Sequence, residues 1–525
     1  MKNRTLLAIL CAFPFAALAA VACGDSSGVD DGGGASDGGD LQGGGPTGKA
    51  EEPDPALVSP SDGNTTGAVG SGGGGGSSAI ESLCDGLVDT ATRVDVSFHG
   101  HPSTAGAQYA RARLLHVPSL APDPTLLRAE DFLAYYGLGY ETAVANGLEP
   151  LRVRWYQTGG DPLTSTSGVL QADFSASPTE REALRLIVLA DVSQSLGSSL
   201  PLVHDAIRAL GRGIEASTMP GDTMAVLTFA GDIVTELDGP IQPGAPYGGL
   251  PIESLALAPR EGNDFVTAVR EAIKVASNGA TSAHVVLLTD GGANVSDDLL
   301  EEVRTAASKG IRLSVAQIGA ELSTGPAPLA RGFLESVAGA GRGGQFYIAD
   351  TSAADRVFDT RFGPSLAIQA RAALLTVKLP PFLRAVGLPM PVPGGASGPA
   401  GGALGPDALH PTRIGLQATC PDVFTNPLAG TFDMSAELSG SVAGEEKVLA
   451  SLSTDWLELR GESAFTARND AILAVAQALR TRSPADVEAA RSELAAVLPD
   501  GKFECLECEQ MMELKQLLEA AEALP

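Results

Sequence analysis

The stretch LIVLADVSQSLGSSLP, residues 186–201, carries an apolar run into Asp191 and then places hydroxyls at alternate positions, Ser193 and Ser195. A short apolar run that ends at polar residues is typical of a strand buried on both faces of a sheet. The residues that follow, PLVHDAIRALGRGIEA, repeat apolar side chains at the spacing of an amphipathic helix. The stretch therefore predicts a buried strand that turns into a helix, with a carboxylate and two hydroxyls at the turn.

The same alternation of apolar runs and amphipathic stretches continues to residue 361. Four more runs have the composition of buried strands: TMAVLTFAG, HVVLLTDGG, IRLSVAQIG and GQFYIAD. The stretches between them, such as FVTAVREAIKVASN and SDDLLEEVRTAASK, have the spacing of helices. We therefore expect an α/β domain over residues 180–365, with a doubly wound, mostly parallel sheet and helices on both of its faces.

A second carboxylate, Asp290, follows another of these runs. In open α/β sheets, ligands bind beyond the carboxyl ends of the strands, so Asp191, Ser193, Ser195 and Asp290 are expected at one edge of the sheet. Oxygen ligands of this kind suit hard cations such as Mg²⁺ or Mn²⁺. The alternative is that both serines are ordinary loop residues, in a strand that only turns into a helix.

These motifs resemble the metal-ion-dependent adhesion site of the von Willebrand factor type A domain, which uses D-x-S-x-S, a threonine on a second loop and an aspartate on a third. The resemblance implies that Ser193 and Ser195 ligate the cation directly, while Asp191 and Asp290 orient waters and supply charge. It also implies that an acidic side chain of a protein ligand completes the coordination.

The second loop departs from the family pattern. Within REGNDFVTAVREA, Asn263 stands where the family has its threonine, and Asp264 follows it. Two outcomes stay open. Asp264 could ligate the cation directly and make the site more anionic, or the site has lost its adhesive geometry and binds nothing.

The N-terminus has the pattern of an export signal. MKNRTLLAILCAFPFAALAAVACGDSS, residues 1–27, joins basic residues to an apolar stretch that ends in small residues. AVAC, at residues 20–23, resembles the lipobox of bacterial lipoproteins, although Ala20 stands where leucine is usual. The resemblance implies that residues 1–23 are a lipoprotein signal peptide that ends at Cys23, and that Cys23 carries acyl chains that anchor the protein to a membrane. A plain signal peptide is the alternative.

A Gly/Ser/Asp-rich tether is expected over residues 24–78, because its composition offers little apolar surface to bury. Four cysteines lie beyond it, Cys84, Cys420, Cys505 and Cys508. In an exported protein these cysteines are free to form disulfides, and their pairing stays open. CLEC, which holds the last two, could also be read as a redox or zinc motif, but the chain has no second CxxC.

Three further regions flank the predicted α/β domain. Residues 79–178 form an N-terminal region, in which TLLRAEDFLAYYG predicts a helix capped by Thr125 and LRVRWY predicts a strand. Residues 366–462 are β-rich, with a Pro/Gly loop at 388–411, and residues 463–525 are helical. Two helical stretches, LRAEDFLAYYGLGYE and FTARNDAILAVAQALR, resemble a subgroup of exported bacterial proteins in which flanking segments surround a von Willebrand factor type A domain.

Charge and motifs restrict the function. The formal net charge of −28 excludes the usual basis of nucleic-acid affinity, which is neutralisation of phosphates by Lys and Arg. No glycines bracket Ser193 as in a hydrolase elbow, and no phosphate-binding loop is present, so neither an enzyme nor a small-molecule substrate is expected. We expect a protein anchored in the cell envelope, facing the periplasm or the cell surface, that recognises or adheres to a protein ligand through a divalent cation. A metal-free scaffold that assembles envelope proteins is the alternative. A metal-assisted hydrolase would need a general base that neither loop offers.

Overall fold

The structure is a computed structural model of the whole chain. The residues that it describes are 92–97, 103–116, 121–136, 151–156, 167–174, 183–215, 218–278, 282–291, 295–319, 321–322, 325–326, 328–362, 370–380, 382–391, 403–404, 410–418, 433–442, 445–455, 464–498 and 506–524. All of them belong to one compact unit, Gly73–Pro525. The predicted signal, Cys23, the tether, Cys84, Cys420 and Cys505 lie outside the described residues, and the side chain of Cys508 is not described.

A six-stranded sheet forms the centre of the predicted α/β domain. Its strand order is β11-β8-β7-β4-β5-β6, and every neighbouring pair is parallel except the hairpin of β5 and β6. The strands are β4 (Leu184–Asp191), β5 (Thr223–Phe229), β6 (Ile233–Pro240), β7 (Ser282–Thr289), β8 (Ile311–Ile318) and β11 (Arg342–Ile348). Every residue of β7 and β8 is buried, as the unbroken apolar runs predicted. The predicted fold class is confirmed.

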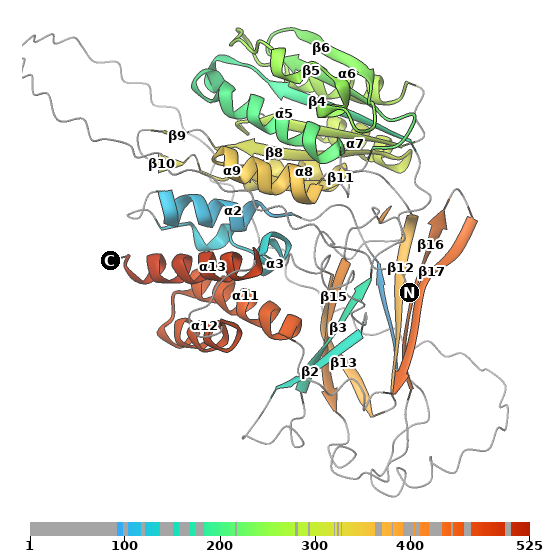
Figure 1. Cartoon of the computed structure of the whole chain (residues 1–525), viewed down its shortest axis with the longest axis vertical. Coiled ribbons are helices and arrows are strands. Elements are labelled where there is room, and N and C mark those ends of the chain that lie inside the picture. Colours follow the sequence, from blue (N-terminus) through green and yellow to red (C-terminus); the bar gives the residue numbers. More distant parts are fainter. Residues whose placement is uncertain are drawn as a thin grey trace, which may run out of the picture. The chain divides into compact units, whose positions relative to one another are not determined.

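Helices connect these strands, and they are the green and yellow coils of Figure 1. They are α5 (Leu200–Glu215), α6 (Phe265–Ala276), α7 (Asp297–Ser308), α8 (Arg331–Ala340) and the single turn α9 (Thr351–Ala354), with the short turns η4 (Gln194–Ser199), η5 (Pro246–Gly249) and η6 (Ile252–Ser254) and the π-helix η7 (Asp355–Phe362). Helix α6 packs on β4 and β7, whereas α8 packs on β8 and β11. A two-stranded ribbon, β9 (Glu321–Leu322) and β10 (Gly325–Pro326), precedes α8.

Helix α5 lies very close to η7. A Cβ atom built on Gly213 would collide with the carbonyl oxygen of Phe358, so this helix position admits only glycine at the present separation. Arg212, the neighbouring residue, forms ion pairs with Asp355 and Asp359 of η7. Close backbone approach and flanking charge pairs therefore hold η7 against α5.

The N-terminal region closes the edge of the sheet at β11. Helix α2 (Ala105–Arg111) begins after Thr104, whose N–H donates to the carbonyl oxygen of Gln345 at 2.9 Å. The buried Gln108 then accepts from the N–H of Tyr347 through Oε1, also at 2.9 Å. An open sheet edge offers unpaired backbone groups to other chains, and these contacts satisfy them internally.

Strands from both sides of the α/β domain build two further sheets. Their orders are β1-β12-β16-β17, with β14 paired to β12, and β13-β15-β3-β2. The strands are β1 (Thr92–Ser97), β2 (Leu151–Tyr156), β3 (Ser167–Phe174), β12 (Ala370–Leu379), β13 (Leu383–Pro391), β14 (Ala403–Leu404), β15 (His410–Ala418), β16 (Asp433–Val442) and β17 (Glu445–Asp455). Because β1 pairs with β12 and β3 with β15, the α/β domain is inserted between strands that belong together. Parts of β13 and β15, together with β14, fall within the stretch 388–411 that we expected to be a loop.

The C-terminal helices pack against the helices of the N-terminal region. Helices α11 (Ala464–Thr481), α12 (Pro484–Val497) and α13 (Leu506–Glu522) contact one another, and α11 also contacts α3 (Ala129–Tyr136). Glu513 of α13 accepts a hydrogen bond from the Tyr136 hydroxyl at 2.8 Å and pairs with Arg111 and Arg356. One carboxylate thus joins the N-terminal region, the α/β domain and α13. In the part of the chain that the structure describes, no helix is both long enough and apolar enough to cross a membrane.

The expected cap at Thr125 is wrong. Asp123 accepts a hydrogen bond from the N–H of Thr125 at 2.9 Å and caps the short turn η2 (Pro124–Leu126), while α3 begins only at Ala129. Asp123 stands directly before a proline, which is a favourable first residue of a helical turn. This places the turn, rather than the longer helix, after the capping residue.

Gly213→Ala should lower the free energy of unfolding by about 1–3 kcal/mol, because the added methyl group forces α5 and η7 apart. Gly332→Ala is the matched control, since a Cβ atom on this helical glycine meets nothing within 4 Å. We expect the control to be neutral or stabilising by up to about 1 kcal/mol, as alanine restricts the unfolded chain more than glycine does. Urea unfolding followed by circular dichroism measures both. Equal effects of the two substitutions would contradict the close packing of α5 on η7.

Candidate metal-binding site

Asp191 is the last residue of β4 and is fully buried at the carboxyl edge of the sheet. Its Oδ1 atom accepts a hydrogen bond from the backbone N–H of Ser193 at 2.9 Å. Its Oδ2 atom accepts one from the hydroxyl of Thr289, the last residue of the neighbouring strand β7, also at 2.9 Å. The carboxylate is therefore fixed by one bond from each of two adjacent strand ends.

The two serines lie side by side on the turn that follows. The Oγ atoms of Ser193 and Ser195 are 3.0 Å apart, close enough for one to donate to the other. Ser193 is buried and Ser195 is exposed, so the pair extends from the sheet edge to the surface. The turn η4 starts between them and leads directly into α5.

Asp290 follows β7 and is half-buried. Its negative charge adds to the causes that raise the pKa of Asp191. Gly291, next in the chain, has a φ of +83°, a conformation that side chains rarely adopt, and its N–H donates to the Thr289 hydroxyl at 3.3 Å. Thr289 thus supports both Asp191 and the loop of Asp290, a role that we did not predict.

The second loop lies between the ends of β4 and β5. The N–H of Arg260 donates to the carbonyl oxygen of Val192 at 2.8 Å, and the N–H of Asp264 donates to that of Ala230 at 2.6 Å. The guanidinium group of Arg260 also pairs with Asp232 at 3.2 Å. The predicted second loop therefore reaches the same edge of the sheet as the serine motif.

Asp264 and Asn263 are both exposed on this loop. The Oδ1 atom of Asp264 accepts a hydrogen bond from the N–H of Thr267 at 3.2 Å, which makes Asp264 the N-cap of α6. One of its carboxylate oxygens is thus already engaged by the helix that it caps. Asn263 directly precedes this capping residue.

Burial is the largest cause that raises the pKa of Asp191, and the charge of Asp290 adds to it. The hydrogen bonds from Ser193 and Thr289 lower the pKa of Asp191, but both come from neutral groups. Ionised Asp191 therefore carries a negative charge that its own partners do not balance, and a cation at this edge would balance it.

The donor set fits a hard divalent cation. It offers the hydroxyls of Ser193 and Ser195 and the carboxylates of Asp191 and Asp290, all of them oxygen donors. No group of three or more carboxylate, imidazole or thiol side chains that could hold a metal ion occurs among the described residues. A cation here would therefore depend on the serine hydroxyls as well as on the carboxylates.

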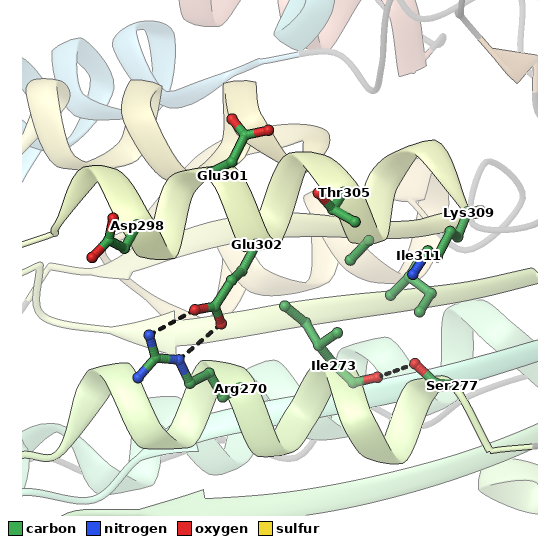
Figure 2. Close-up of a pocket in the computed structure, with 10 residues that line it drawn as sticks. Arg270, Ile273, Ser277, Asp298, Glu301, Glu302, Thr305, Lys309 and Ile311 are labelled. Carbon is green, nitrogen blue, oxygen red and sulfur yellow. Dashed lines mark hydrogen bonds and ion pairs between the residues drawn. The ribbon is translucent and has the colours of Figure 1, made fainter.

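A groove of about 510 Å³ between α6 and α7 is separate from this site (Figure 2). Arg270 crosses it and forms two hydrogen bonds with Glu302, at 2.8 and 2.7 Å. Ile273 and Ile311 form part of its wall. The site residues at the strand ends do not line this groove, and its central charges neutralise each other, so it contributes nothing to the candidate site.

No protein-family model and no curated protein match the chain. Among solved structures, a von Willebrand factor type A protein from Catenulispora acidiphila is 15% identical, with 67% of this chain and 92% of that chain covered and a TM-score of 0.38. The ArnB paralog VWA2 from Sulfolobus acidocaldarius is 13% identical, with 71% and 98% covered and a TM-score of 0.34. Proximal thread matrix protein 1 from the mussel byssus, whose structure has a zinc-occupied MIDAS motif, is 15% identical, with 36% and 48% covered and a TM-score of 0.26. At these identities, a likeness concerns the fold alone.

Asp191→Asn should not destabilise the protein in chelator at pH 7 and should raise its midpoint of thermal unfolding. Burial raises the pKa of Asp191, so the folded state binds its proton more tightly than the unfolded state, and ionisation costs stability as the pH rises. The neutral amide avoids this cost while Thr289 and Ser193 keep a partner. The advantage of the variant should shrink as the pH falls and Asp191 becomes protonated. A variant that melts well below the parent at pH 7 would contradict this electrostatic account.

Proposed function

We propose that the α/β domain, expected over residues 180–365, is a von Willebrand factor type A domain, and that the chain is a binding protein that recognises a protein ligand through Mg²⁺ or Mn²⁺ held at the carboxyl edge of its sheet. The observation that carries the proposal is the grouping of the Ser193 and Ser195 hydroxyls beside the buried carboxylate of Asp191. The hydrogen-bond partners of this carboxylate are neutral, so they do not balance its negative charge. When bound, the cation supplies an open coordination position for an acidic side chain of the ligand.

The site residues would play different roles toward the cation, according to their positions. Ser193 and Ser195 would ligate the cation through their hydroxyls, and their spacing of 3.0 Å suits two ligands on one ion. Asp191, held by Ser193 and Thr289, would fix water and supply charge, as would Asp290.

The second loop would contribute the amide oxygen of Asn263. Asp264 caps α6 with one oxygen, so we assign it the role of adding negative charge and, through its second oxygen, of holding a water. This makes the site more anionic than one with a threonine in the same place. The proposed function needs binding chemistry only, and no histidine lies beside Ser193, Asp290 or Asn263 in the sequence to act as a general base.

The proposed envelope location rests on the N-terminal sequence. We propose that Cys23 is lipidated after export and that residues 24–78 hold the folded unit away from the bilayer. An exposed cation site on a tethered domain would be suited to adhesion or to recognition of a second envelope protein.

One observation favours a metal-free scaffold as the second candidate. Asp264 is engaged as a helix cap, and the type A domain is fastened to both flanking regions through the Glu513 cluster of Arg111, Tyr136 and Arg356. In that case the partner surface would lie elsewhere, and partner binding would persist in chelator.

Mg²⁺ and then Mn²⁺ titrated calorimetrically into the mature protein should give heat that saturates near one equivalent. The double variant Ser193→Ala/Ser195→Ala should weaken binding by at least about 100-fold, because it removes both direct ligands. Ser277→Ala/Ser308→Ala is the matched control, since it removes two exposed hydroxyls at the ends of α6 and α7. Dilution heat alone from the parent at millimolar cation would refute the proposed site and favour the scaffold.

Cys23→Ala should move the exported protein from the detergent phase to the aqueous phase of a Triton X-114 partition. The cysteine is the proposed attachment point of the acyl chains. Cys84→Ala serves as the control and should stay in the detergent phase. Recovery of the parent itself in the aqueous phase would favour a plain signal peptide.

A further inference from the structure

Gln317 is a buried amide at the carboxyl end of β8, where it lies opposite Thr289 of β7 in the sheet register. Its Nε2 atom donates to the carbonyl oxygen of Asp290 at 3.2 Å and to that of Pro328 at 2.9 Å. Its Oε1 atom accepts from the N–H of Ala330 at 2.7 Å. Both N–H groups and the carbonyl oxygen of one side chain are thus engaged by the backbone of two loops.

The two loops touch each other beside this amide. A Cβ atom on Gly291 would lie 2.8 Å from the Cβ atom of Ala330, so the loop of Asp290 packs directly on the residue that precedes α8. Ala330 is the N-cap residue of α8 but has no capping side chain. Gln317 supplies the acceptor that the start of this helix lacks.

The segment 328–330 is also attached to the N-terminal region, through the residue that follows it. Arg331, the first residue of α8, is bonded to the carbonyl oxygen of Leu126 and lies 3.6 Å from the buried carboxylate of Asp131 in α3. Gln317 therefore attaches the Asp290 loop to a segment that is itself fixed to the N-terminal region.

We propose that Gln317 is a positioning residue of the cation site, which sets the place of Asp290 without touching the ion. The inference rests on the proposed function and extends it in one respect. Cation affinity should depend on a buried amide on β8, and the segment 328–330 becomes a structural part of the site. Residues that orient metal ligands through hydrogen bonds commonly change metal affinity by about 10- to 100-fold when they are replaced.

The test uses Gln317→Met in the mature protein, because methionine keeps the length of the side chain and removes all three hydrogen bonds. Ser314→Ala is the matched control. Ser314 is another buried polar residue of β8, but its hydroxyl bonds to His284 and to the N–H of Gly344, away from the Asp290 loop. Two readouts are compared with the parent: Mn²⁺ affinity by calorimetry, and amide hydrogen exchange of the metal-free protein in the peptides that contain Gly291 and Ala330.

Gln317→Met should weaken Mn²⁺ binding by about 10- to 100-fold and speed exchange in both peptides, whereas Ser314→Ala should lower the thermal midpoint and change neither readout. Mn²⁺ affinity within threefold of the parent, or unchanged exchange, would overturn the inference. If Gln317→Met does not fold, Gln317→Leu also removes the three hydrogen bonds without adding a charge, and its Mn²⁺ affinity decides in the same way. If the parent binds no cation, the proposed function fails, and exchange alone decides whether Gln317 holds the two loops together.

Discussion

The buried charge of Asp191 is the constraint around which this edge of the sheet is organised. The apolar run of β4 delivers the carboxylate to a site from which water is largely excluded, and its hydrogen bonds come from the neutral Ser193 N–H and Thr289 hydroxyl. These bonds orient the carboxylate without cancelling its charge. The nearby carboxylate of Asp290 makes ionisation of Asp191 harder still. A divalent cation is the ligand that would relieve both effects at once.

The loops at this edge of the sheet are positioned by hydrogen bonds and an ion pair from residues that would not touch the ion. Thr289 connects the ends of β4 and β7, Gln317 connects β7 to the start of α8, and Arg260 attaches the second loop to the hairpin of β5 and β6. Farther away, Gln108 closes the edge strand β11, and Glu513 fastens the flanking helices. The α/β domain is therefore an insertion held by contacts with both flanking regions, which suits a rigid binding face.

Local sequence patterns predicted the parts of the fold that depend on local physics. Unbroken apolar runs identified the buried strands, and those strands placed Asp191 and Asp290 at one edge. Thr289 was missed because its role requires β4 and β7 to be neighbours, which periodicity does not reveal. The sequence did contain a signal for Gln317, because a glutamine inside the apolar run of β8 must find hydrogen-bond partners when it is buried. The pairing of β1 with β12 could not be predicted, because those strands lie on opposite sides of the inserted domain.

The most direct test of the central claim is the anomalous scattering of Mn²⁺ in crystals of the mature protein grown with that cation. We predict one strong anomalous peak in contact with the Oγ atoms of Ser193 and Ser195, with Asp191 and Asp290 reaching it through water. A map without a peak at this edge, from crystals that hold millimolar Mn²⁺ and have the site open to solvent, would rule out the proposed cation site. The buried charge of Asp191 would then be a structural feature of the strand end rather than part of a binding site.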